Sequence, residues 1–144
     1  MTTAATDSHG TLLQRGNGAS PEIFTTVAEV RDIDAPGISK NRHEATSHDS
    51  NGWSERISGI KTLGEMSCEI NWIPSNTTHN EVAGLIYDAT SETDRNYRLV
   101  FPDASAEKMT FRGTVTEFQS MAPVDGVLRA KVKFDATGAP TWSN

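Results

Sequence analysis

The sequence predicts a mainly β protein, an antiparallel β-sandwich or small barrel with one flanking α-helix, a long β-loop and flexible terminal arms. Several segments alternate apolar and polar residues, which is typical of half-buried strands. One stretch has the period of a helix, and polar segments without any period lie between and beside the strands. Together these observations indicate strands joined by long polar segments.

The N-terminal part predicts an arm and two strands. Residues 1–12 are small and polar and predict a flexible arm, with a short strand at residues 11–15. Residues 23–33 are rich in β-branched side chains and predict a longer strand, which Ala35-Pro36-Gly37 ends because proline removes a backbone donor. One face of that strand would carry Phe24, Thr26, Ala28 and Val30.

Residues 38–58 form the most polar and least periodic segment, and they predict a long loop. Its stretch HEATSH, from His43 to His48, resembles the HExxH zinc motif, but the histidines are five residues apart where a shared helix face needs four. We therefore expect no metal and no cofactor. Trp53 in the same loop has two interpretations, an anchor for another surface or a side chain folded back on its own domain.

The middle of the chain predicts one strand and the only helix. Residues 65–73 alternate in polarity and place four apolar side chains on one side: Met66, Cys68, Ile70 and Trp72. Thr78 followed by Glu81 fits a capping box, which predicts a helix over about residues 78–90. The apolar stripe of that helix would be Val82, Leu85, Ile86 and Ala89.

The C-terminal part predicts three more strands. Residues 95–103 and 108–121 read as a pair, and Phe118 breaks the alternation, which indicates a bulge near Thr116 and Glu117. Residues 127–135 alternate again after a tight turn. Residues 135–144 read as an irregular tail in which Trp142 is expected to dock on another group.

Length, charge and cysteine content narrow the class of protein. The 144 residues fit one domain, and a net charge of −6 disfavours a protein that grips nucleic acid. The single cysteine, Cys68, excludes an internal disulfide, and its place on an apolar strand face predicts an inert thiol. No window approaches 18 apolar residues, and the N-terminus lacks the features of a signal peptide. We expect neither a membrane anchor nor conventional secretion.

No catalytic residue is predicted. A nucleophile needs a base and an orienting acid, and the serines are too numerous for one to stand out. The cations Arg129, Lys131 and Lys133 share the outer face of the last strand and could be read as a nucleic-acid track. This stripe is short and lacks interleaved aromatic residues, which favours a solvated face or salt bridges to acids such as Glu65, Glu69 or Glu117.

The order of these elements resembles the major tail tube proteins of long, flexible-tailed bacteriophages of the lambda type. The motifs that carry the resemblance are Trp72-Ile73-Pro74 at the end of a strand, Phe101-Pro102-Asp103 at the end of another, and Phe111-Arg112-Gly113 within a third. The resemblance covers about residues 23–140. It implies a structural virion protein and not an enzyme.

The resemblance also implies how such a protein works. Subunits would form hexameric rings that stack into a hollow tube, their inner sheets would join into a continuous β-barrel, and DNA would pass through the acidic lumen without specific binding. The partners would be the protein itself, a tape-measure protein, tail-terminator proteins and distal tail or baseplate proteins. The location would be the virion tail, after assembly in the host cytoplasm. Some relatives carry an additional immunoglobulin-like domain, which we do not expect in residues 1–144.

In that family the N-terminal arm, the long loop and the C-terminal tail contact neighbouring subunits, and these map to residues 1–12, 38–58 and 135–144. We expect these segments to become ordered on polymerisation. The residues expected at the assembly interface are Ser39, Arg42, His43, His48, Trp53, Arg56, Arg129, Lys131, Lys133 and Trp142.

Three alternatives stay open, because a fold by itself does not choose a function. The first is a β-barrel binding module that does not polymerise. The second is a related component of a tail-like or secretion tube. The third is a hydrolase built on the same fold.

Overall fold

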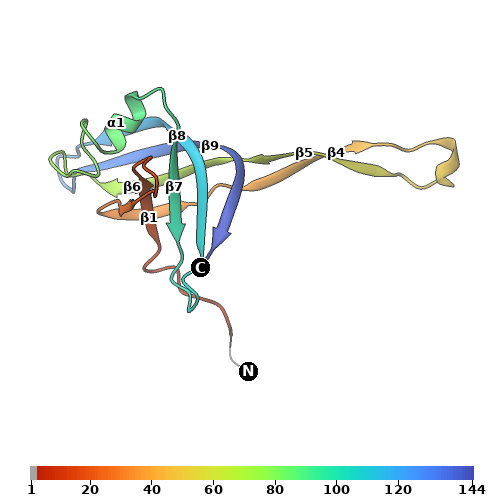
Figure 1. Cartoon of the computed structure of the whole chain (residues 1–144), viewed down its shortest axis with the longest axis horizontal. Helices are drawn as coiled ribbons and strands as arrows, with labels where there is room; N and C mark the ends of the chain where they lie inside the picture. Colours follow the sequence, from red (N-terminus) through yellow and green to blue (C-terminus); the bar gives the residue numbers. More distant parts are fainter. Residues whose placement is uncertain (1–2) are drawn as a thin grey trace.

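The computed structural model describes residues 3–144 and consists mainly of antiparallel strands (Figure 1). Seven strands form one sheet in the order β2-β1-β7-β8-β9-β6-β3, and β4 pairs with β5 alone. The elements are β1 (Leu12–Gly16), β2 (Phe24–Thr26), β3 (Val30–Asp34), β4 (Ile38–Glu44), β5 (Arg56–Leu63), β6 (Glu65–Asn71), α1 (Leu85–Thr90), β7 (Arg95–Val100), β8 (Lys108–Met121) and β9 (Arg129–Ser143). The predicted class, mainly β and antiparallel with one helix, is confirmed.

The two longest strands allow one sheet to form both layers of a sandwich. The first part of β8, up to Gly113, pairs with β7, and the first part of β9, up to Asp135, pairs with β6. The pairing of β8 with β9 continues across both layers. The sheet does not close into a barrel, because β2 and β3 are its two edge strands.

A single apolar core lies between the layers. The predicted alternation is confirmed on β6, where Met66, Cys68 and Ile70 are buried, and on β7, where Tyr97 and Leu99 are buried. The rings of Tyr97 and Phe134 meet edge to face with centroids 4.8 Å apart. Every long strand of the sheet contributes to this core, which therefore joins the two layers.

The predicted bulge in β8 is confirmed, because its register with β9 shifts between Val115 and Glu117. A second shift, between Thr110 and Arg112, places three β9 residues opposite Phe111. Between the two shifts the strands approach so closely that a Cβ at Gly113 would collide with the carbonyl oxygen of Asp135. This contact gives a structural reason for glycine in Phe111-Arg112-Gly113.

The single strand predicted over residues 23–33 is wrong. The structure breaks it into β2 and β3, because Glu29 has a φ of 58° and the chain turns there. Val27 is buried, and its amide donates to the carbonyl of Leu13. Ala28 is held from the other side: its amide donates to Thr78 Oγ1 at 3.1 Å, and its carbonyl accepts from His79 Nε2 at 2.6 Å.

The predicted helix is also shorter than expected. Thr78 does not act as a helix cap, because its hydroxyl donates to Asn76 Oδ1 and accepts from the Ala28 amide. Turns occupy the following residues, and α1 begins at Leu85 after Gly84. Tertiary hydrogen bonds to the β2–β3 turn have therefore overridden the local capping signal. Within residues 3–144 no helix is long and apolar enough to cross a membrane.

Two segments predicted to be irregular contain strands. The expected loop at residues 38–58 is instead most of the β4–β5 hairpin, and the expected tail at residues 135–144 belongs to β9 up to Ser143. In the N-terminal arm, residues 3–11 contain no strand, as predicted, whereas residues 1 and 2 lie outside the described residues. The short strand predicted at residues 11–15 is β1.

A buried carboxylate fastens the helix to the sheet. Asp88 on α1 is 3% exposed and receives both Nε and Nη2 of Arg15, at 2.6 and 2.8 Å. Arg95 Nε donates to Oδ1 at 3.1 Å, and the Tyr97 hydroxyl donates to Oδ2 at 2.9 Å. All four groups belong to α1, β1 or β7, so this network fixes one end of the sandwich.

Removing the Asp88 charge should destabilise the fold. Asp88→Asn would leave two guanidinium groups facing a neutral amide, and we expect a loss of about 3 kcal/mol in the free energy of unfolding. Urea denaturation gives this value directly. The matched control is Glu92→Gln, at an exposed position two residues after α1. Its free energy of unfolding should stay within about 0.5 kcal/mol of the parent's. Equal stability of the two variants would contradict a structural role for Asp88.

The buried thiol predicts loss of stability at alkaline pH. Burial raises the pKa of Cys68 to about 12, from an ordinary value of 9.0. Between these values the unfolded chain has released a proton that the folded chain still holds, so stability falls as pH rises. We expect a loss of roughly 1 kcal/mol per pH unit. Urea titrations between about pH 8 and pH 11 should give a shallower slope for Cys68→Ala, and identical slopes would contradict this assignment.

Candidate assembly interface

The β4–β5 hairpin extends away from the sandwich as a long arm (Figure 1). Its strands pair from Ile38 with Leu63 to Glu44 with Arg56, and the register shifts once, between Lys40 and Arg42. Every residue of β4 is exposed, and on β5 only Gly59 and Leu63 are partly or fully buried. The hairpin is thus ordered by its own backbone ladder but contributes almost nothing to the core.

Large apolar side chains lie on this exposed arm. Ile38, Ile57 and Ile60 are 61%, 60% and 75% exposed, and Trp53 near the tip is 78% exposed. A two-stranded hairpin with both faces in water is marginally stable at best. These side chains therefore favour a partner surface that covers the hairpin.

The tip of the hairpin is a defined structure and not a loose loop. The Ala45 amide donates to the Glu55 carbonyl, and the Glu55 amide donates to Thr46 Oγ1. The Trp53 amide donates to the carbonyl of Ser50, which is buried beneath the turn. On this ordered turn Trp53 is largely exposed, which contradicts the interpretation that its ring folds back on its own domain.

Charge is divided unevenly between the hairpin and the rest of the chain. Strands β4 and β5 carry four cations, Lys40, Arg42, Arg56 and Lys61, and one carboxylate, Glu44, for a net +3. The turn that joins the two strands adds Asp49 and Glu55, so residues 38–63 together carry +1 and, because the whole chain is −6, the remaining residues carry −7. Lys40 and Lys61 lie directly opposite each other, a like-charge pair that is unfavourable without a counter-charge.

The predicted interface residues fall into two separate groups. Ser39, Arg42 and His43 lie on β4, and Arg56 lies on β5. Between these strands, His48 lies in the short 3₁₀ turn His48–Ser50 and Trp53 follows that turn. The second group, Arg129, Lys131, Lys133 and Trp142, lies on β9 in the sandwich. In the described part of the chain, no three His, Cys, Asp or Glu side chains are placed to hold a metal ion.

The cations of β9 are partly neutralised within the chain. Arg129 approaches Glu69 at 3.6 Å, and Lys133 approaches Glu117 at the same distance. Lys131 lies between them, opposite Glu69 on one neighbouring strand and Gln119 on the other. This arrangement agrees with the prediction of a solvated face with salt bridges, and such surface pairs add little stability.

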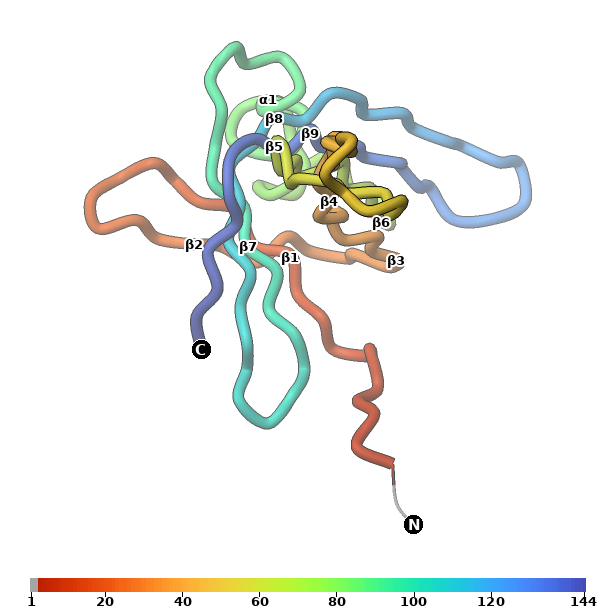
Figure 2. The backbone as a smooth tube through the Cα atoms, turned by 90° about the vertical axis from the view of Figure 1, so that its right-hand side faces the viewer, coloured from red at the N-terminus to blue at the C-terminus, as the bar shows by residue number. Residues whose placement is uncertain are grey.

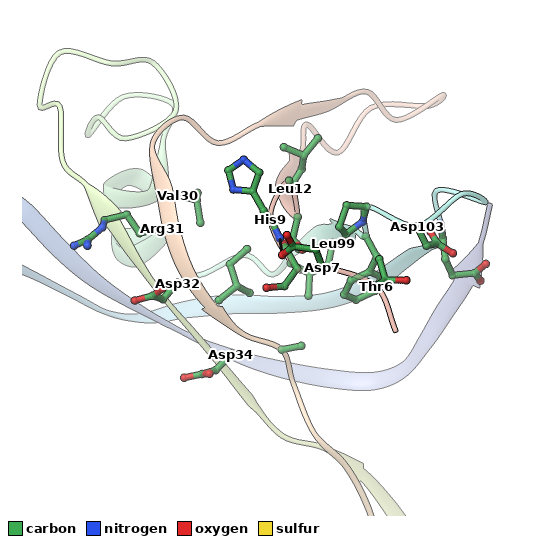
Figure 3. A pocket seen from close by; sticks show the side chains of 18 residues that line it. Thr6, Asp7, His9, Leu12, Val30, Arg31, Asp32, Asp34, Leu99 and Asp103 are labelled. Carbon is green, nitrogen blue, oxygen red and sulfur yellow. Dashed lines mark hydrogen bonds between the residues drawn. The ribbon is translucent and has the colours of Figure 1, made fainter. Parts of the chain in front are cut away.

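A groove that sequence reasoning missed lies between β3 and the start of β1 (Figure 3). On one side are residues 6–12, the end of the N-terminal arm and the first residue of β1, and on the other are β3 and Ala35. Leu99, Phe101, Pro102, Asp103 and Glu107 complete the lining. It is open and measures about 1240 Å³. We call it the acidic groove. Its residues come from three distant parts of the chain, so no local pattern could have revealed it.

Trp142 docks beside this groove, as the sequence predicted. Its ring stacks on Phe101 with the centroids 6.5 Å apart and an interplanar angle of 20°, yet it remains 51% exposed. Phe101 belongs to the Phe-Pro-Asp motif, in which Asp103 Oδ1 accepts the Glu107 amide and closes a turn. The motif therefore shapes the far wall of the groove.

A sandwich with open edges and a projecting arm that covers nothing defines a self-assembling structural subunit. The chain belongs to the lambda phage tail tube protein family, whose model matches residues 7–143. It is thus a structural component of a tail tube in phage-like particles. The predicted family is confirmed.

Solved structures of similar fold come from related assemblies. One is described as the tail of an empty gene transfer agent particle with C6 symmetry. Its chain is 15% identical to this one with a TM-score of 0.73, and the alignment covers 97% of this chain and 100% of that chain. Another is described as a sheath/tube terminator of an extracellular contractile injection system, at 8% identity, a TM-score of 0.73 and full coverage of both chains. A third, described as the baseplate of the anti-feeding prophage, has 11% identity, a TM-score of 0.69, and covers 100% of this chain and 98% of its own. At these identities the likeness concerns the fold. No curated protein matches the chain.

The exposure of Trp53 makes a simple prediction for the single subunit. Trp53→Ala should change the free energy of unfolding by no more than about 0.5 kcal/mol, because most of the side chain is exposed to solvent in the single subunit. Trp72→Ala is the contrasting variant: Trp72 packs against the core and its ring meets Phe118 edge to face at 5.6 Å, so we expect a loss of roughly 2–4 kcal/mol. Both values come from urea denaturation of unassembled protein. A large loss in Trp53→Ala would show that Trp53 supports the subunit itself.

Proposed function

We propose that this protein forms hexameric rings, that the rings stack into the tail tube of a virion, and that the tube conducts the genome during delivery. The observation that carries the proposal is the β4–β5 hairpin, an ordered arm with exposed apolar side chains and no surface of its own chain to cover them. Family membership supports the tube, and the C6 symmetry of a relative of the same fold supports six subunits in a ring.

Open sheet edges support ring formation. Edge strands β2 and β3 present unpaired backbone groups, and a ring that pairs the edges of neighbouring subunits removes this risk of uncontrolled aggregation. In our proposal the inner sheets join in this way into one continuous barrel. The contacts between subunits and between stacked rings would come from residues 1–12, 38–58 and 135–144, together with Arg129, Lys131 and Lys133.

The negative charge supports a conduit and not a DNA-binding surface. Outside residues 38–63 the chain carries −7, and a wall of like charge limits adhesion of a polyanion that must slide past it. The proposed partners are a tape-measure protein within the tube, tail-terminator proteins at one end and distal tail or baseplate proteins at the other. Assembly would take place in the host cytoplasm, and no catalytic activity is proposed.

Electron microscopy of the purified protein tests this proposal. We expect rings or tubes of uniform width in negative stain. Trp53→Ala should raise the protein concentration needed for tubes by about tenfold or more, because interface tryptophans often contribute over 1 kcal/mol each. Val82→Ala, which truncates another exposed apolar side chain at 73% exposure, is the control and should assemble normally. A monodisperse monomer at high concentration would favour a binding module that does not polymerise.

A further inference from the structure

The acidic groove holds carboxylates that have no cationic partner. Asp7, Asp32, Asp34, Asp103 and Glu107 line it, and within residues 3–144 none of them makes an ion pair. The one guanidinium among the lining residues, Arg31, donates instead to Glu69 on β6 at 3.1 Å. Figure 3 shows Arg31 directed away from Asp7 and His9. The groove is therefore an uncompensated negative surface.

The groove also offers apolar surface. Leu12, Val30, Ile33 and Phe101 line it, and Leu12 is 40% exposed. A cationic segment with exposed apolar side chains would therefore match both the charge of the groove and its apolar lining.

The β4–β5 hairpin has the complementary properties. Its two strands carry +3, and with Asp49 and Glu55 of the turn the whole hairpin carries +1. Lys40, Arg42, Arg56 and Lys61 make no ion pair in the described part of the chain. The opposed lysines Lys40 and Lys61 need a counter-charge, which five unpaired carboxylates can supply. Ile38, Ile57 and Ile60 offer apolar surface on the same strands.

We propose that the β4–β5 hairpin of a second copy of this chain docks in the acidic groove, with Lys40 and Lys61 meeting its carboxylates. The inference rests on the proposed tube function and names the surface that receives the hairpin. Docking within one chain is excluded by geometry, because the hairpin runs out from the sandwich and away from the groove (Figures 1 and 2). The contact is therefore between copies.

Such a contact joins two different surfaces, so each copy offers a hairpin to one neighbour and a groove to another. Repetition of this head-to-tail contact gives a closed ring or an open stack, and both are consistent with a tube. Because exposed charges carry the contact, salt should weaken it. The same charges would give the contact its direction, since hairpin against hairpin and groove against groove both repel.

Two charge-reversed variants test the pairing. The hairpin variant is Lys40→Glu with Lys61→Glu, and the groove variant is Asp32→Lys with Glu107→Lys. These four side chains make no hydrogen bond or ion pair within residues 3–144, so reversal should leave the fold intact, which urea denaturation checks. Each variant alone should need at least about tenfold more protein than the parent to form tubes.

Mixing the two variants provides the decisive measurement. In an equimolar mixture the reversed hairpin meets the reversed groove, and the unchanged hairpin meets the unchanged groove. Assembly should therefore recover to within about threefold of the parent. The control pair, Arg112→Glu and Glu92→Lys, reverses exposed charges outside the groove and the hairpin and should assemble normally alone.

The outcomes separate the two proposals. If the parent forms no rings or tubes, the proposed function itself fails. If the parent forms tubes and both reversed variants assemble at parental concentrations, the docking proposal alone is overturned. Two defective variants that do not rescue each other in the mixture would also overturn it, because hairpin and groove would then contact different partners.

Discussion

The seven-stranded sheet folds over one core but leaves β2 and β3 unpaired at its edges, and this open arrangement determines how the molecule can be used. Closing the barrel within one chain would satisfy those backbone groups and leave nothing for a neighbour. Instead β8 and β9 run through both layers and bend at their register shifts, and the sheet stays open. The acidic groove lies between one edge strand, β3, and the start of β1.

Stability and assembly are carried by different parts of the chain. Apart from Leu63, the buried apolar side chains of residues 3–144 belong to the sandwich. Asp88 fastens α1 to β1 and β7 through two arginines and a tyrosine. The β4–β5 hairpin adds only Leu63 to the core. A subunit can therefore fold before it meets a partner, and changes in the hairpin can alter assembly without unfolding the sandwich. This separation suits a protein that must remain soluble until a growing end is available.

The sequence predicted the strands whose side chains alternate, because burial on one face leaves a local period that any core strand must show. It missed features set by distant contacts. Thr78 and His79 turn away from a helix to hold Ala28, which also divides residues 23–33 into two strands. The hairpin was missed for the opposite reason: with both faces in water its strands have no apolar period, and only the backbone ladder defines them. The ten predicted interface residues include six on the hairpin, but the groove joins segments too far apart to be recognised locally.

The hairpin and the rest of the chain have net charges of opposite sign, which the overall charge of −6 does not reveal. This difference is the feature that matters most for assembly. A uniformly acidic subunit would repel its neighbours in every orientation, and an evenly mixed surface would attract them in many. A net positive charge on one projecting element of an otherwise acidic subunit makes most encounters repulsive and leaves one attractive orientation, hairpin toward groove. The acidity that keeps DNA from adhering to the wall can then coexist with attraction between subunits, because the two effects use different parts of the same chain.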